Sequence, residues 1–130
     1  MLLFGHKFIE SDSFYHIQDI DAITHTPPSS TIYLEFSEDI LDIIKHAQLN
    51  TVDMALSVLD IKELIYASSL GAKYIVVEKQ NAKIAQDIAE NYLFDAKILV
   101  LVAEDNELEE LAILGIDGVL YSNAIIKINS

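Results

Sequence analysis

The sequence predicts an α/β protein with a mainly parallel sheet of about five strands and helices on both faces, in a three-layer arrangement. One indication is a repeated pattern: residues 70–77 (LGAKYIVV) and 114–121 (LGIDGVLY) each place a glycine at the end of a predicted helix and an apolar strand shortly after it. A second is the almost unbroken apolar composition of residues 98–102, which is expected of a strand buried on both faces. A third is the even spacing of the predicted helix ends, which lie 21, 23 and 21 residues apart at Asn50, Gly71, Phe94 and Gly115.

The first 30 residues are the least regular part of the chain. Their apolar side chains occur at uneven spacing and are interrupted by Gly5 and by the polar residues 10–13. We interpret residues 1–30 as an irregular N-terminal arm or short strands, because consecutive prolines at positions 27 and 28 forbid a helix there. The whole chain, residues 1–130, is expected to form a single α/β domain with regular βα units over residues 31–130.

Two βα units open the regular part. Residues 32–36 are rich in β-forming side chains and end at Ser37, a favourable N-cap for the helix that follows. A second strand is predicted over residues 52–59. It leads into a capping box, in which Asp60 is followed three residues later by Glu63.

The second half of the chain continues the alternation. Strands are predicted over residues 74–77, 98–102 and 119–121, and a terminal strand or turn over residues 125–128. Asn106 and Glu109 have the spacing of a further helix cap. The clearest helical period belongs to an apolar face formed by Ile84, Ala85, Ile88, Ala89, Tyr92 and Leu93.

Two architectures fit this order of elements. Five parallel strands in a chain of this length match a flavodoxin-like domain in size. Residues 71–76 and 115–120 resemble the helix-to-strand junctions of TIM barrels, which implies half-TIM-barrel-like βα repeats as the alternative. Because half a barrel leaves two sheet edges exposed, an open sheet is the preferred interpretation.

Composition favours a folded cytoplasmic protein. Hydrophobic residues make up 52% of the chain and charged residues 22%, well above the range of disordered chains. The absence of cysteine excludes disulfides, thiolate catalysis and sulfur-ligated metals. The first apolar segment is too short for a secretory signal, and the longest aliphatic run, residues 98–103, falls far short of the roughly 20 residues that span a bilayer.

The net charge of the chain argues against two classes of partner, nucleic acids and anionic membranes. The net charge is −13, from 21 acidic residues and 8 basic residues, all of them lysine. Nucleic acids and anionic membranes require clustered cations, and base readout relies on arginine, so we expect neither as a partner. A cation or a basic protein suits this charge better.

Carboxylates follow several of the predicted strands. In parallel sheets chemistry gathers at the carboxyl ends of the strands, where Glu35, Asp60, Glu78, Glu104 and Asp105 are expected. Oxygen ligands suit Mg²⁺ or Ca²⁺, and helix capping explains Glu78 and Glu104 least. Glu35, at the end of the first regular strand, is taken together with them. These three are therefore the candidate metal ligands, and a divalent cation is the only cofactor that the pattern indicates.

Other signatures of catalysis or cofactor binding are missing. The four histidines share no ligand spacing, and the four glycines form neither a phosphate-binding loop nor a dinucleotide fingerprint. No catalytic residue is assigned. The favoured hypothesis is a non-catalytic binding or interaction module that binds a protein partner or a second copy of itself as a homodimer. Its candidate interaction residues are the aromatic residues of the arm, Phe4, Phe8, Phe14 and Tyr15. The alternative is a small hydrolase or lyase that depends on a divalent cation bound at the carboxylates.

Overall fold

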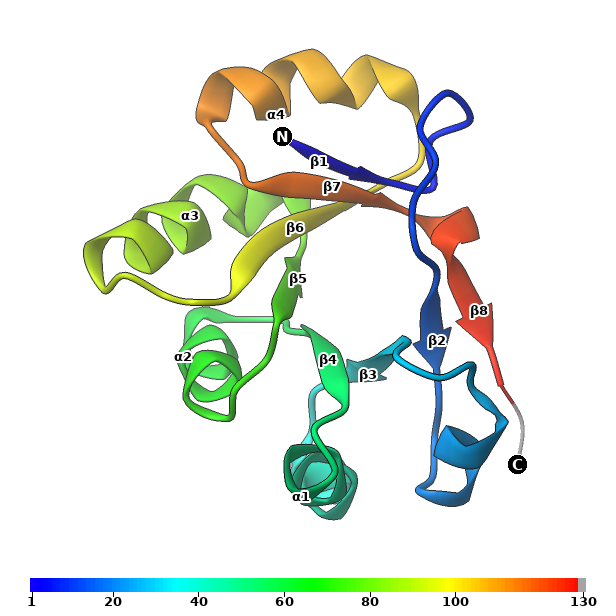
Figure 1. Cartoon of the computed structure of the whole chain (residues 1–130). Coiled ribbons are helices and arrows are strands. Elements are labelled where there is room, and N and C mark those ends of the chain that lie inside the picture. The colour runs from blue at the N-terminus through cyan, green and yellow to red at the C-terminus, as the bar shows by residue number, and fades with distance from the viewer. Residues whose placement is uncertain (129–130) are drawn as a thin grey trace.

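The computed structural model describes residues 1–128, which form one curled sheet of eight strands (Figure 1). All paired strands are parallel, and their order across the sheet is β1-β7-β6-β5-β4-β3-β2-β8. The α/β class and the parallel sheet are confirmed, with more strands than the five predicted. The strands are β1 (Leu2–Phe4), β2 (Phe14–His16), β3 (Thr31–Glu35), β4 (Asp53–Ser57), β5 (Tyr74–Val77), β6 (Lys97–Val102), β7 (Gly118–Tyr121) and β8 (Ile125–Lys127).

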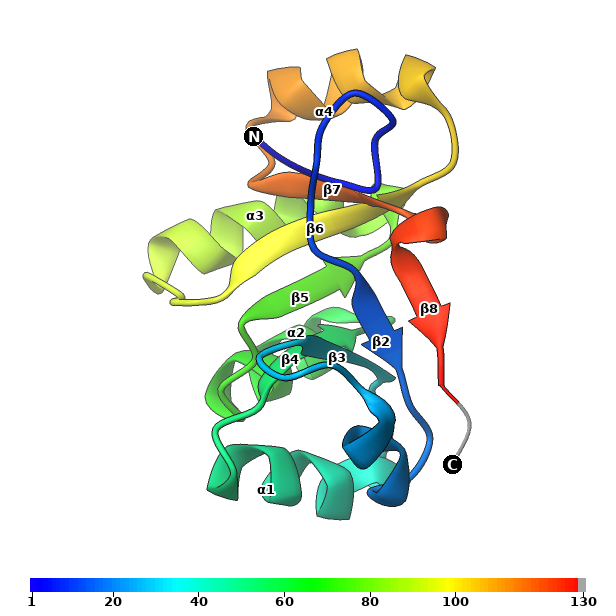
Figure 2. The same cartoon turned by 45° about the vertical axis from the view of Figure 1, so that its right-hand side comes forward.

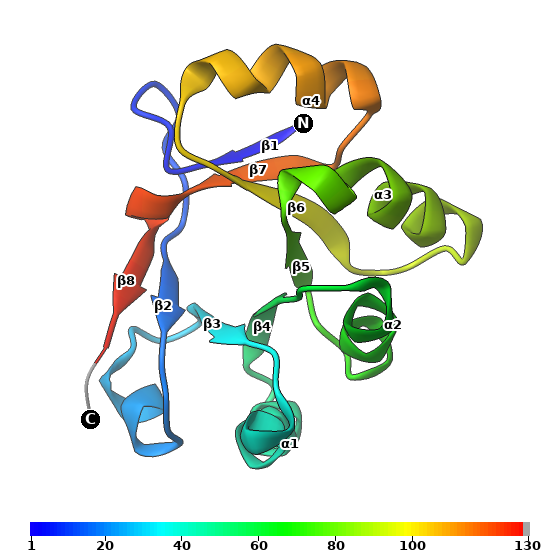
Figure 3. The same cartoon turned by 180° about the vertical axis from the view of Figure 1, so that it is seen from behind.

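The four α-helices of the described chain lie outside the curl of the sheet, as Figures 1 and 3 show from opposite sides. They are α1 (Leu41–Leu49), α2 (Ile61–Ser69), α3 (Ala82–Asn91) and α4 (Leu108–Leu114). The prediction of helices on both faces is therefore wrong, and the arrangement is the half-barrel alternative. Strands β3 to β7 lie in the sheet in their chain order, so right-handed crossovers place every connecting helix on the same face.

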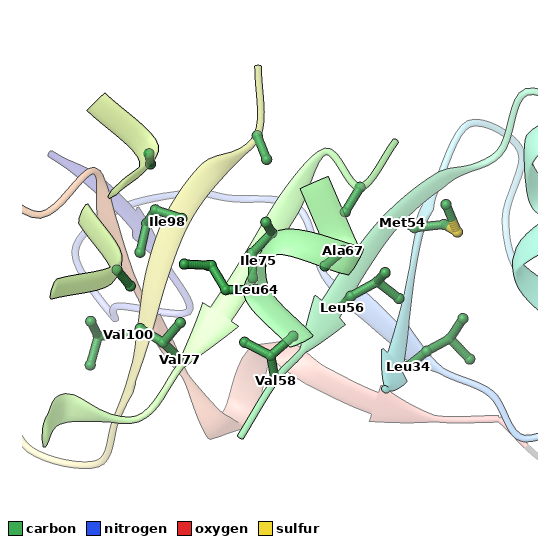
Figure 4. Close-up of a cluster of buried hydrophobic side chains, with 14 of the residues drawn as sticks. Leu34, Met54, Leu56, Val58, Leu64, Ala67, Ile75, Val77, Ile98 and Val100 are labelled. Carbon is green, nitrogen blue, oxygen red and sulfur yellow. The ribbon is translucent and has the colours of Figure 1, made fainter. Parts of the chain in front are cut away.

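The convex face of the sheet packs against these helices. On α2, Leu64 and Ala67 lie among strand side chains that include Leu56 and Ile75 (Figure 4). All of these side chains are fully buried. Burial of this type stabilises the fold by about 25 cal/mol for each Å² of apolar surface removed from water.

The concave face has its own core and needs no helix to cover it. Side chains from β1 to β7 fill it together, with Phe4, Phe14 and Tyr74 in ring contact at centroid distances of 5.0 to 5.4 Å. Neighbouring residues on a strand alternate between the two cores: Ile98 and Val100 face the helices, and Leu99 faces the concave interior. Both faces of the sheet are therefore buried, as the apolar strands predict.

Residues 1–30 contribute two strands to the sheet. Strand β1 pairs with β7, and β2 lies between β3 and β8, as Figure 2 shows for β2 and β8. Phe14 is 1% exposed in the concave core. Each strand has three residues, too few for a period to be recognised in the sequence.

The four helices end in a common way. The residue that follows each helix end by one or two positions has a positive φ: Thr51 (56°), Gly71 (86°), Leu93 (53°) and Gly115 (79°). Glycine takes this conformation without strain, and other residues take it at a cost. The predicted ends at Gly71 and Gly115 are confirmed, and those near Asn50 and Phe94 are shifted by one residue.

The loop after β1 is joined to the segment between β7 and β8. Asn123, in the short η5 helix (Ser122–Ala124) before β8, donates a hydrogen bond from Nδ2 to the Gly5 carbonyl oxygen at 2.9 Å. A Cβ atom at Gly118, on β7, would lie only 2.7 to 2.8 Å from atoms of Leu2 and Leu99. The close approach of β1 to β7 thus depends on a glycine at position 118.

No helix within residues 1–128 combines the length and apolar character needed to cross a membrane.

Candidate functional site

The predicted metal ligands lie at three different strand ends. Glu35 ends β3, Glu78 follows β5, and Glu104 follows β6 just before the short η4 helix (Asp105–Glu107). All three are exposed. Within residues 1–128, no three His, Cys, Asp or Glu side chains are grouped so that they could hold a metal ion. The metal site therefore stays a prediction without support from the arrangement of these side chains.

Other carboxylates at this edge of the sheet serve as helix caps. Asp60 Oδ1 accepts a hydrogen bond from the Glu63 backbone N–H at 2.9 Å, and the Glu63 carboxylate accepts from the Leu59 N–H at the same distance. The predicted capping of α2 is thus confirmed. Before α4, the cap differs from the predicted pair of Asn106 and Glu109. The Glu107 carboxylate accepts hydrogen bonds from the backbone N–H groups of Ala103 and Glu104, so the capping carboxylate lies two residues earlier in the chain than Glu109. These two hydrogen bonds lower the pKa of the Glu107 carboxyl.

A polar cluster of three side chains joins the carboxyl ends of β1, β6 and β7. It consists of His6, Asp105 and Tyr121 and is called the His6 cluster. The Tyr121 hydroxyl donates a hydrogen bond to Asp105 Oδ1 at 2.6 Å, and His6 Nε2 lies 3.3 Å from the same oxygen. The rings of His6 and Tyr121 are in edge contact at 5.5 Å. A shallow depression of about 430 Å³ adjoins the cluster.

The hydrogen bonds of the His6 cluster assign its protons. The Phe8 backbone N–H donates to His6 Nδ1 at 3.1 Å, so in the neutral ring the proton lies on Nε2 and points toward Asp105. The hydrogen bond from the Tyr121 hydroxyl lowers the pKa of the Asp105 carboxyl. Burial, followed by the hydrogen bond to Asp105, raises the pKa of Tyr121 to about 12. Both ring nitrogens and the phenol are engaged within the protein, and this arrangement fastens the loop after β1 to β6 and β7.

The predicted interaction residues of the arm occupy different environments. Phe4 and Phe14 lie in the concave core, and their burial explains their apolar character. Phe8 is 78% exposed, and its ring contacts His6 at 4.9 Å and lies 5.3 Å from Lys7 Nζ. Tyr15 is half-buried on β2. Of the four, Phe8 is the side chain most open to a partner.

A larger hollow, called the α1–α2 groove, lies between the first two helices and has a volume of about 820 Å³. Three apolar or aromatic side chains define it: Phe36, which follows β3, Leu41 on α1 and Tyr66 on α2. The rings of Phe36 and Tyr66 lie 6.2 Å apart. Leu41 is 38% exposed and Tyr66 51% exposed, so large apolar surfaces face the solvent. The groove is lined by Phe36, Ser37, Glu38, Leu41, Asp60, Lys62, Glu63, Tyr66, Ser69 and Leu70.

The groove has two different ends. Near the ends of α1 and α2, Gln48 Nε2 donates a hydrogen bond to the Leu70 carbonyl oxygen at 2.6 Å and joins the two helices. Near their beginnings the groove is bordered by the carboxylates of Glu38, Asp60 and Glu63. The arrangement provides a concave apolar surface with negative charge at one end, which is suited to binding more than to bond-making chemistry.

Sequence patterns identified neither the His6 cluster nor the α1–α2 groove. Leu41 begins α1, whose apolar residues Ile43 and Ile44 are buried, yet its own side chain is 38% exposed. His6 was placed in an irregular arm, although Phe4 and Gly5 before it repeat the apolar-then-glycine pattern seen elsewhere in the chain. The groove depends on how far apart two helices lie, and no local pattern reports that distance.

Comparison with protein-family models gave no match, and no curated protein sequence matches the chain.

Proposed function

We propose that this protein is a non-catalytic binding module that engages a protein partner through the α1–α2 groove. The observation that carries this proposal is the exposure of Leu41 and Tyr66 on the two walls of a concave surface. Isolated exposed apolar residues are common on protein surfaces, whereas apolar side chains gathered around a hollow favour an interaction site. Tyrosine is also among the residues that contribute most to binding energy at interfaces.

The polar groups at the same edge of the sheet support binding over catalysis. In the His6 cluster, Asp105 and Tyr121 are hydrogen-bonded to each other, and His6 accepts a backbone N–H. Lys79, another polar residue after β5, forms an ion pair with Glu110 at 2.9 Å. A general acid or base needs a proton-transfer atom directed at a substrate, and these atoms are directed at one another.

Photo-crosslinking tests the proposal in the cells that make the protein. A benzophenone amino acid is placed at position 66 in the groove and, as the matched control, at Tyr92, an exposed tyrosine at the end of α3. We expect position 66 to give a discrete adduct with one protein and position 92 to give none. We also expect binding of that purified protein to fall by at least about tenfold in Tyr66→Ser, because an aromatic anchor contributes about 2 kcal/mol or more.

The pattern of adducts separates the alternatives. An adduct between two copies of this chain would identify self-association as the function of the groove. Equal labelling from positions 66 and 92, or partner binding that survives Tyr66→Ser unchanged, would contradict the proposal.

A further inference from the structure

We infer that the segment bound in the α1–α2 groove is cationic and carries a large apolar side chain, a chemistry that depends on the proposed function of the groove. The other surfaces of the described chain give weaker grounds for a binding site. The depression at the His6 cluster is bordered by groups that bond to each other, and strands β1 and β8 at the two outer edges have only three residues each. The groove is distinguished by a second feature, the distribution of charge around it.

Negative charge surrounds the beginning of α1 on both sides. On one side lies the groove, with Glu38, Asp60 and Glu63 among its lining residues. On the other side is a smaller depression of about 210 Å³, whose lining includes four aspartates. The acidic border is defined as the acidic residues that line these two neighbouring depressions. Glu38, Asp60 and Glu63 line the groove itself, and Asp19, Asp21, Asp39 and Asp42 line the smaller depression across α1.

Positive charge is scarce in the same region. Lys62 is the one lysine among the residues that line the two depressions. Seven acidic residues against one basic residue give this part of the described surface a strongly negative potential. Such a field attracts cations, accelerates their association and opposes the binding of anionic segments.

The way the carboxylates are held favours a protein cation over a metal ion. Asp60 and Glu63 are fixed by backbone hydrogen bonds in the cap of α2, so each carboxylate is held at a defined place. No group of three acidic or histidine side chains within residues 1–128 is close enough together to hold a metal. Separated negative charges along a groove match lysine or arginine side chains spaced along a peptide.

The apolar walls of the groove explain the second part of the inferred chemistry, the large apolar side chain of the bound segment. Leu41 and Tyr66 stand beside the ring of Phe36, so an apolar side chain from the partner would replace water against three large surfaces. Burial of this anchor gives affinity, and the acidic border selects the charge of the residues that flank it. The inferred ligand is therefore a short peptide segment with a large apolar residue between basic ones.

Selection from a random dodecapeptide display library tests this inference. The full chain serves as the target, and each recovered peptide is compared on wild type, on Tyr66→Ser and on the control Tyr92→Ser. We expect the peptides that discriminate against Tyr66→Ser, and not against the control, to be enriched in Lys and Arg around Phe, Leu, Ile or Trp.

Charge is tested on the same peptides with two matched double variants. Asp39→Asn with Asp42→Asn removes two charges of the acidic border, and Glu90→Gln with Glu109→Gln removes two exposed charges on α3 and α4. We expect the first pair to weaken binding about fivefold or more and the second less than about twofold, because solvent screens distant exposed charges. Raising the salt concentration should weaken binding to wild type.

The outcomes distinguish the inference from the proposed function. Peptides that require Tyr66 but are neutral or acidic would overturn the inference and leave the groove as a binding site. Equal effects of the two double variants would also overturn it. If no peptide discriminates wild type from Tyr66→Ser, both the inference and the proposed function are contradicted.

Discussion

The α1–α2 groove and the His6 cluster lie at the same edge of the sheet and use their side chains differently. In the His6 cluster polar atoms meet each other, as the 2.6 Å bond between Tyr121 and Asp105 shows. In the groove, the large side chains of Leu41 and Tyr66 face the solvent. The residue types associated with chemistry hold the loop after β1 in place, and ordinary apolar residues form the open surface. Polar side chains at the strand ends therefore have a structural part in this protein.

The comparison predicts that the His6 cluster depends on the position of β1, whereas the groove does not. Gly118→Ala adds a methyl group 2.7 to 2.8 Å from the backbone and side chain of Leu2 and the side chain of Leu99. We expect a loss of about 1–3 kcal/mol in the free energy of unfolding, because a crowded site must shift to accept it. Urea denaturation measures this loss, and peptide binding at the groove should remain unchanged in the folded variant.

Gly115→Ala is the matched control for that substitution. A Cβ atom at Gly115 meets no atom within 4 Å, so its cost comes from the φ of +79° and should be about 1 kcal/mol. A smaller loss for Gly118→Ala than for Gly115→Ala would show that β1 moves away without cost.

Removing one hydroxyl from the His6 cluster should have a moderate effect. Tyr121→Phe breaks the hydrogen bond to Asp105, and because solvent screens the exposed Asp105 carboxylate, we expect a smaller loss of stability than for Gly118→Ala. The variant should also change the response to alkali. In the folded protein the pKa of Tyr121 is raised from 10.0 to about 12, so folding favours the protonated phenol. That stabilisation is complete below pH 10 and is lost as the pH rises toward 12.

The free energy of unfolding, measured by denaturant titration between pH 8 and pH 11, checks this prediction. Wild type should lose more stability across that range than Tyr121→Phe. Some loss should remain in the variant, because burial also raises the pKa of Tyr33 in the concave core. Parallel curves for the two proteins would show that the phenol of Tyr121 is not linked to folding.

The smallest effect on stability is expected in the groove. Leu41→Ser and Tyr66→Ser change exposed side chains, so each should alter the free energy of unfolding by less than about 0.5–1 kcal/mol while peptide binding is lost. Calorimetry and peptide titration on the same samples give the two quantities. A large loss of stability in either variant would mean that the groove is part of the core and not a binding surface.

Much of the fold could be predicted because its signals are local. The glycines at 71 and 115 mark helix ends, the Asp60 and Glu63 pair marks a helix start, and the apolar runs mark strands buried on both faces. The strand order has no local signal, and it decides whether helices cover one face or two. The count of five strands left residues 1–30 as an irregular arm or short strands and residues 125–128 as a strand or turn, since the three residues of each of β1, β2 and β8 are too few to show a period.

The candidate sites were less predictable for the same reason. Glu78 and Glu104 follow their strands as expected, and Glu35 is the last residue of its strand. Whether side chains at different strand ends converge depends on the curvature of the sheet. Phe4 and Phe14 were expected to meet a partner, and in the folded chain they meet each other at 5.0 Å. An aromatic residue has the same appearance in a sequence whether its neighbours come from its own chain or from another.

The pairing of β1 with β7 has a consequence for the order in which the protein is made. The ribosome synthesises β1 long before its neighbour, and the hydrogen bond between Gly5 and Asn123 joins residues 118 positions apart. Strands β3 to β7 can assemble one after another as they emerge, because each pairs with the next in the chain. Strand β1 can pair only after the last of them has been made.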